Sequence, residues 1–333
     1  MSLLPHAPSL RRLASALGPL FGLGLIVVIF RIIVGEGFTD WYNVQTILAD
    51  TTIVAIAALG MTLVIIGGGI DLSTGSVVAL ASVVCAKSLA GLIGVDGAMT
   101  PAAWCAAFGA GIGIGMLCGA INGLAIVGLR VVPFIATLGM LSIARGAAKW
   151  QSANIPINIT YDFGEWVQPY LPEGWSWLLV APSVWLALGL ALVFGLVLHR
   201  TVYGRHVVAL GSSEPTARLC GLRIGWLKIS LYAVAGAMAG LAGVVQAARL
   251  TRGDPSVGVG LELNVIAAVV IGGGSLMGGE GRILGTLAGA LIMSVLATGA
   301  TQAGWENYIQ EILVGLIIVL AVALDQLRAR RAA

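Results

Sequence analysis

The sequence has 333 residues, of which 58% are hydrophobic and 10% are charged. A soluble domain carries about 25% charged residues, so this composition and a mean hydropathy of +0.99 exclude a water-soluble globule and a disordered chain. The net charge of +3 gives no basic face for nucleic acid. Because a membrane span needs about 20 apolar residues, the length accommodates roughly ten spans joined by short loops.

Ten apolar segments follow one another along the chain. We expect helices, because in lipid each segment must satisfy its own backbone hydrogen bonds. The first segment follows Arg11 and Arg12 and is too long for the apolar core of a signal peptide, so we interpret it as a span. The predicted spans are 14–34, 46–69, 72–93, 102–127, 131–150, 178–198, 227–248, 260–277, 283–303 and 308–326. The sequence therefore predicts one all-α polytopic membrane domain over residues 1–333.

The positions of Lys and Arg predict the orientation. Cytoplasmic loops carry an excess of these residues, and most of them fall on one side when the N-terminus is placed inside. The longest loop on the other side, 151–177, has three acidic residues and no Lys or Arg. An even number of spans then places both termini in the cytoplasm. Some cations fall in the outer halves of spans, where we expect them to extend outward to water: Arg31, Lys87, Arg145 and Lys149.

Two loops are long enough to act as docking surfaces. The outer loop 151–177 contains three Pro and three Trp residues, which indicate either an interfacial Trp belt or a surface for an outside partner. The cytoplasmic loop 199–228 contains a helix-start signal at Glu214-Pro215 and a stop at Gly221. We therefore predict a helix of about six residues there, between two spans.

Two glycine runs interrupt the apolar segments. Gly67–Gly69 leads into Asp71, and Gly272–Gly274 leads into a second polar stretch that ends at Arg282. Matching breaks can mark the transport site of a carrier. The predicted topology places both at cytoplasmic ends, which favours tight turns that line an inner gate, with Asp71 within reach of water. The candidate gate residues are Gly68, Gly69, Asp71, Gly272 and Gly273.

Glycines also recur every four residues inside the fourth span and in one later span. This spacing is typical of faces on which membrane helices approach closely. The pairs are Gly109/Gly113, Gly111/Gly115, Gly115/Gly119, Gly119/Gly123 and Gly236/Gly240.

Several kinds of chemistry are missing from the sequence. It has no G-x-x-x-x-G-K-[ST] loop for ATP, no H-E-x-x-H and no G-x-S-x-G, and its three His residues lie outside the predicted spans. The four Cys form no C-x-x-C pair, which argues against a metal site or a disulfide framework. No acidic or basic residue is clearly central, which weakens the hypothesis of an ion-coupled carrier. Asn122 and Asn264 suit a hydroxylated cargo or a bond between helices.

Residues 68–76, with the sequence GGIDLSTGS, resemble the GGIDLSVGS signature of bacterial sugar ABC-importer permeases of the ribose, arabinose, galactose and galactofuranose branch. Further motifs match in the same order over roughly residues 44–325. They are 119–123 (GAING), 133–140 (PFIATLGM), 143–146 (IARG), 217–222 (ARLCGL) and 261–273 (LELNVIAAVVIGG). Residues 155–158 and 161–162 are similar to a galactofuranose permease.

The resemblance implies a type II-like ABC importer permease fold in the bacterial inner membrane. Such a permease pairs with a second copy or a paralogue, with a periplasmic sugar-binding protein, and with a cytoplasmic ATPase subunit that holds the Mg-ATP. Residues 211–222 match the coupling helix, although Ser213-Glu214-Pro215 departs from the expected Asn-x-x-Ala pattern. We assign Glu214, Arg218 and Gly221 to coupling, and Asn122, Thr137 and Asn264 to the sugar path. The alternative is a stand-alone ion-coupled sugar carrier or facilitator.

Overall fold

The computed structural model describes residues 10–92, 99–171 and 174–330, and this part of the chain is mostly helical. The α-helices found there are α1 (Leu10–Val34), α2 (Trp41–Ile66), α3 (Thr74–Ala90), α4 (Pro101–Gly128), α5 (Pro133–Gln151), α6 (Pro182–Arg200), α7 (Val202–Ser212), α8 (Glu214–Leu219), α9 (Ile224–Leu250), α10 (Leu261–Ile271), α11 (Ile283–Gln302) and α12 (Asn307–Arg330). The all-α prediction is wrong in one detail, because β1 (Ile157–Asn158) pairs antiparallel with β2 (Arg252–Gly253).

Five of these helices are long and apolar enough to cross a membrane by themselves: α2, α4, α6, α9 and α11. The predicted span 260–277 is wrong as a continuous helix. α10 has 11 residues, which at 1.5 Å per residue gives roughly 16 Å, about half of the hydrocarbon thickness of a bilayer. The helix stops there because a glycine run follows, and Gly273 takes a φ of +91°, which side chains disfavour.

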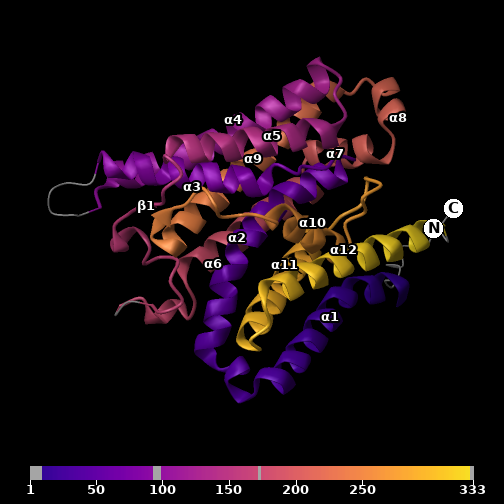
Figure 1. Ribbon diagram of the computed structural model, residues 1–333. Helices are drawn as coiled ribbons and strands as arrows, with labels where there is room; N and C mark the ends of the chain where they lie inside the picture. Colours follow the sequence, from indigo (N-terminus) through magenta and orange to yellow (C-terminus); the bar gives the residue numbers. More distant parts are fainter. Residues whose placement is uncertain (1–9, 93–98, 172–173, 331–333) are drawn as a thin grey trace.

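Helices α3, α4, α5 and α9 form the larger layer (Figure 1), in which α9 packs against α3 and α4 and also contacts α2. Close packing of α4 on α9 follows from their glycines. A Cβ on Gly119 would lie 2.0 Å from the carbonyl oxygen of Tyr232, and one on Gly115 would lie 2.3 Å from that of Gly236. The predicted packing face is therefore confirmed for this series, which also includes Gly111 and Gly240.

The other glycine series on α4 was wrongly assigned to this face. Among the described residues, no heavy atom lies within 4 Å of a Cβ built on Gly109 or Gly113. The two series point in different directions because they are offset by two residues, which is about 200° around a helix. Only one of them faces α9.

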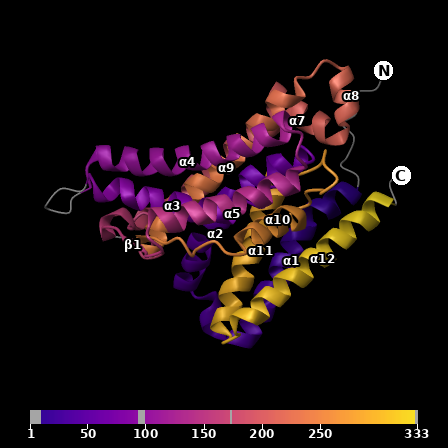
Figure 2. The same ribbon diagram turned by 45° about the horizontal axis from the view of Figure 1, so that its top comes forward.

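A second layer is formed by α1, α11 and α12 with the short α10 (Figure 2). The contact of α1 with α11 is apolar, with Phe30 and Val295 buried there. In both views α1 begins and α12 ends on the side of the molecule that carries α8, and β1 lies on the opposite side (Figures 1 and 2).

Polar contacts tie the helices together at the end opposite α8. Arg249, near the end of α9, donates from Nε to Asp50 Oδ1 of α2 at 2.8 Å and from Nη1 to Gln168 Oε1 at 2.9 Å. These bonds join two helices to the predicted outer loop. Asp50 and Arg249 therefore lie at the same end of the molecule.

Candidate coupling and transport site

Helix α8 is the short helix predicted between two spans. Ser213 caps its N-terminus, because the Ser213 Oγ accepts a hydrogen bond from the backbone N–H of Thr216 at 3.3 Å. Glu214 lies in the first turn, where its negative charge interacts favourably with the helix dipole. Pro215 is a residue type that is common at the start of a helix. Gly221 follows the end of the helix with a φ of +81°. Local signals therefore explain both ends of α8.

The preceding helix, α7, was not predicted. It begins after Thr201, whose side chain accepts a hydrogen bond from the backbone N–H of Gly204 at 3.2 Å. Thr is a favoured N-cap residue, so this signal is present in the sequence. The polar composition of 199–212 led to the interpretation of that stretch as a loop.

Glu214 fastens α8 to α9. Its carboxylate accepts a hydrogen bond from Lys228 Nζ of α9 at 2.7 Å and one from Arg218 at 3.0 Å. The hydrogen bond from Lys228 is the main cause that lowers the pKa of Glu214 below its ordinary value. The structure thus brings together two of the three predicted coupling residues. Gly221 is exposed, and within the described residues nothing lies within 4 Å of a Cβ placed on it.

The first glycine run and residues 278–281, which follow the second run, meet the end of α7. The backbone N–H of Gly279 donates to the carbonyl oxygen of Ile66 at 2.8 Å, and a Cβ on Gly278 would lie 3.0 Å from Gly68 Cα. Gly211 fits between them, since its Cβ would lie 1.7 Å from the oxygen of Ile66. We call the contact of residues 67–69, 211–212 and 278–281 the glycine junction. It joins the turn after α2 to the segment before α11 and to the helix that leads into α8.

The other predicted gate residues lie beside this junction. Gly272 packs on α11, where its Cβ would lie 2.4 Å from the carbonyl group of Gly285. Gly273 has open space around it within the described residues. Gly69 lies against Tyr232, whose hydroxyl oxygen is 2.5 Å from a Cβ placed there. The sequence signalled the turns, but it gave no sign of Gly211, the residue that fills the space between them.

The prediction that Asp71 reaches water is wrong in this structure. Its exposed fraction is 2%, and it accepts hydrogen bonds from the backbone N–H and the Oγ of Ser73 at 2.8 and 2.6 Å. Asn122 of α4 donates to the same Ser73 Oγ at 3.0 Å. Tyr232 of α9 donates to the carbonyl oxygen of Ile70 at 3.3 Å. The turn before α3 is therefore covered by α4 and α9, which the sequence position of Asp71 does not reveal.

The three predicted sugar-path residues lie on different helices. Asn122 and Thr137 are buried, and the hydroxyl of Thr137 donates to the backbone oxygen of Pro133 one turn earlier at 3.0 Å. Asn264 is half-buried in the first turn of α10. No hydrogen bond among the described residues joins the three side chains, so the structure does not gather them into one site.

A contact that the sequence analysis missed joins the first turns of α3 and α10. A Cβ on Gly75 would lie 2.1 Å from the oxygen of Gly258 and 2.3 Å from Glu262 Oε2. The segment before α10 is held by Arg145 of α5, which donates from Nη1 to the backbone oxygens of Pro255, at 2.9 Å, and Val257. Arg145 was expected to extend to the outer water. It binds these carbonyl groups instead, because the segment lies within its reach.

Residues 43–322 match the model of one protein family, described as "Branched-chain amino acid transport system / permease component". The chain belongs to this permease family. The ribose import permease protein RbsC of Escherichia coli (strain K12) is 38% identical over 306 residues, which cover 90% of this chain and 91% of that protein. RbsC of Bacillus subtilis (strain 168) is 34% identical, over 93% of this chain and 92% of that protein. The D-allose transport system permease protein AlsC of Escherichia coli (strain K12) is 33% identical, over 93% and 91%. No solved structure matches the chain.

The family membership confirms the resemblance drawn from the GGIDLSTGS motif. The permease is a polytopic membrane protein and a transport subunit, not an enzyme. Within the described residues, no group of three or more His, Cys, Asp or Glu side chains is placed to hold a metal ion.

A pair of substitutions separates the structural role of Asn122 from a role on the sugar path. In the permease, Asn122→Ala removes a buried hydrogen bond and should lower the free energy of unfolding by about 1 kcal/mol. Asn264→Ala is the matched control, because no hydrogen bond of its side chain is found among the described residues, and it should change stability by less than about 0.5 kcal/mol. Thermal unfolding in detergent measures both. Equal stability of the two variants would contradict the role of Asn122 in holding Ser73.

Proposed function

We propose that this permease is the membrane subunit of an ATP-driven ABC importer that moves a monosaccharide across the bacterial inner membrane. The supporting observation is that several relatives that match over about 90% of the chain are named for the import or transport of sugars, namely ribose, D-allose and, in Rhizobium meliloti, fructose. The cargo class is therefore a pentose or a hexose, including galactofuranose. The chain carries no cofactor, and Mg-ATP binds to a separate subunit.

The proposed topology has ten membrane crossings with both termini in the cytoplasm. Two observations support it. Lys and Arg gather in the loops on the α8 side, and α1 begins and α12 ends on that same side (Figure 1). In this topology one crossing is formed by α10 together with the turns at 255–260 that Arg145 holds. Irregular backbone at membrane depth is tolerated where protein covers it, as Gly75 and Gly258 show by their contact.

The proposed coupling runs from α8 through the glycine junction. An ATPase subunit docks on the exposed face of α8, and Glu214 transmits its movement to α9 through Lys228. Movement of α7 carries Gly211, which contacts the backbone after α2 and before α11. A ligand shifts such an equilibrium only through contacts that differ between two states. The junction supplies them as direct backbone contacts between three segments that are distant in sequence.

The complete importer contains three further partners in this proposal. A periplasmic binding protein delivers the sugar to the side of the molecule that carries the 151–177 loop. A second permease, identical or a paralogue, completes the transport path, and the ATPase pair binds on the α8 side. Asn122, Thr137 and Asn264 stay predictions for the path, and Gly68, Gly69, Asp71, Gly272 and Gly273 stay predictions for the inner gate.

Reconstitution tests the proposal. Proteoliposomes that contain the permease, its ATPase subunit and its binding protein should accumulate sugar only when ATP is supplied on the ATPase side. The cargo is found beforehand by mass spectrometry of sugar that co-purifies with the binding protein. The competing hypothesis, an ion-coupled carrier or facilitator, predicts uptake by the permease alone under a proton or sodium gradient. Accumulation that is indifferent to ATP would refute the importer.

A further inference from the structure

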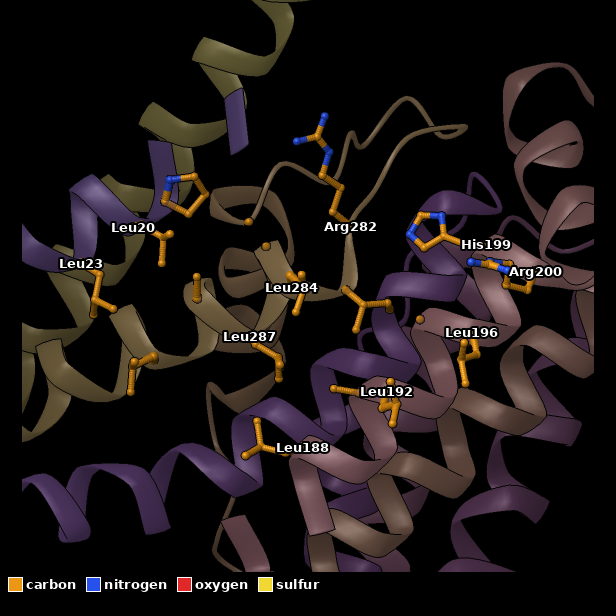
Figure 3. Close-up of a pocket in the computed structure, with 18 residues that line it drawn as sticks. Leu20, Leu23, Leu188, Leu192, Leu196, His199, Arg200, Arg282, Leu284 and Leu287 are labelled. Carbon is orange, nitrogen blue, oxygen red and sulfur yellow. The ribbon is translucent and has the colours of Figure 1, made fainter. Parts of the chain in front are cut away.

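A large apolar cleft opens on the surface between α1, α6 and α11. Its volume is about 1150 Å³, and most of its wall is aliphatic. Leu20 of α1, Leu192 of α6 and Leu284 of α11 line it and are 54%, 65% and 80% exposed. Figure 3 shows these leucines on three different helices around one space. An elongated apolar ligand therefore fits along the cleft.

Three basic side chains stand at one end of this cleft. His199 and Arg200 come from the last turn of α6, and Arg282 directly precedes α11. In Figure 3, Arg282 lies above Leu284, and His199 and Arg200 lie above Leu192 and Leu196. Arg200 and Arg282 are exposed, and among the described residues neither guanidinium takes part in an ion pair or a side-chain hydrogen bond. Two unpaired guanidinium groups at the end of an apolar cleft form a site for an anion with a long hydrocarbon tail.

We propose that the cleft binds one anionic glycerophospholipid from the leaflet on the α8 side. The acyl chains lie along Leu188, Leu192 and Leu284, and the phosphate lies between Arg200 and Arg282. Any lipid covers exposed leucines on a membrane protein, but the cations add selectivity. Basic pockets between membrane helices favour anionic headgroups, and guanidinium groups match phosphate oxygens in geometry. That this leaflet is the cytoplasmic one rests on the proposed topology.

The same lipid contacts two segments that lead into the glycine junction. Arg200 is adjacent to Thr201, which caps α7, and α7 ends at the junction with Gly211 and Ser212. Arg282 follows Gly281, whose Cβ would lie 2.6 Å from the side chain of Ile66. A headgroup held by both arginines therefore links the end of α6, directly before α7, to the segment before α11. The bound lipid restrains the segments through which the proposed coupling passes.

Native mass spectrometry of the purified permease tests the site directly. Phosphatidylglycerol and phosphatidylethanolamine with identical acyl chains are titrated separately, and the affinity of the first bound lipid is measured. We expect the wild-type chain to prefer phosphatidylglycerol by about tenfold, because each cation near a headgroup adds a favourable contribution to anionic lipid binding. The double variant Arg200→Gln/Arg282→Gln should bind the two lipids with affinities that agree within about twofold.

Matched controls identify the ligand and the site. Arg205→Gln removes one positive charge at an exposed position of α7 outside the cleft. This variant should keep the preference for phosphatidylglycerol. Leu192→Trp places a larger side chain in the apolar part of the cleft and should weaken the binding of both lipids to the same extent. Equal binding of the two lipids by the wild type, or an unchanged preference in the double variant, overturns the proposal. Binding of inorganic phosphate as tight as that of phosphatidylglycerol, and unaffected by Leu192→Trp, also overturns it, because the ligand is then the free anion.

Discussion

Replacing Gly119 with alanine should separate α4 from α9 and leave the permease unable to fold stably. The new Cβ would lie 2.0 Å from the carbonyl oxygen of Tyr232 and 2.8 Å from its carbonyl carbon. Both atoms belong to the backbone of α9, so no rotamer change relieves the overlap. Overpacking of a well-packed core typically costs about 1–3 kcal/mol and occasionally more, and we expect about 3 kcal/mol or more here.

Gly113→Ala is the matched control, because it lies on the same helix and in the same kind of G-x-x-x-G spacing. A Cβ there has nothing within 4 Å among the described residues, and alanine favours a helix interior over glycine by up to about 1 kcal/mol. The yield of monodisperse protein and the thermal midpoint in detergent should fall for Gly119→Ala and stay level or rise for Gly113→Ala. If the two variants behaved alike, the packing of α4 on α9 would not be as described.

The glycines of α4 show what the sequence contains and what it lacks. The four-residue spacing correctly predicts a close helix contact, because close approach needs small residues on one face. It does not say which series faces the partner, since Gly109/Gly113 and Gly111/Gly115 have the same spacing. That choice depends on α9, which starts a hundred residues later, and it becomes visible only when both helices are placed.

Local sequence does not show contacts between distant segments, and this also explains the wrong predictions near the two glycine runs. Hydropathy places a span over 260–277 because apolar residues continue up to the glycines, but the helix ends at Ile271, where the backbone turns. Asp71 was expected in water because it lies near the end of a predicted span. Its burial comes from Asn122 and Tyr232, which are distant in sequence. Family motifs, in contrast, occur in contiguous sequence, so the permease family was predicted correctly.

At the coupling site, local sequence signals were sufficient to predict α8, but they did not predict its contact with α9. Ser213, Glu214-Pro215 and Gly221 mark the ends of the helix within nine residues. Lys228 lies 14 residues after Glu214 and on another helix, so no periodicity relates them. The glycine junction could not be predicted for the same reason, because its three segments are distant in sequence: 67–69, 211–212 and 278–281.

Reversing the charge of Glu214 should disconnect α8 from the rest of the permease. Glu214→Lys removes both ion pairs and places a third cation beside Arg218 and Lys228. Because the carboxylate is more than one-third exposed, solvent screens the pairs and the loss of overall stability should be small. The effect on transport should be larger. Coupling free energies between sites typically correspond to about 5- to 150-fold changes, and we expect ATP-driven sugar uptake in proteoliposomes to fall by about tenfold or more.

The double variant Glu214→Lys/Lys228→Glu restores opposite charges between α8 and α9 and should recover much of the uptake. A double-mutant cycle on uptake isolates this pairwise contribution. Arg218→Gln removes only the exposed pair within α8, which is worth a few tenths of a kcal/mol, and it is the control for stability only, because Arg218 is itself a predicted coupling residue. The thermal midpoint of each variant shows whether the fold is kept. Loss of uptake that the charge exchange fails to restore, in a folded variant, would mean that Glu214 acts on the ATPase subunit and not through Lys228.

The pH dependence of the same contact follows from the lowered pKa of Glu214. A carboxylate whose pKa is lower in the folded state than in the unfolded state stabilises the fold at pH values above the unfolded pKa. This contribution disappears as the pH falls through the lowered, folded pKa. The attachment of α8 to α9 therefore persists throughout the neutral range and weakens only in acid. Glu214→Gln accepts hydrogen bonds without carrying a charge, so its stability should lack this acid-dependent loss. If the coupling step depends on the ion pair, the variant should lack that step already at neutral pH.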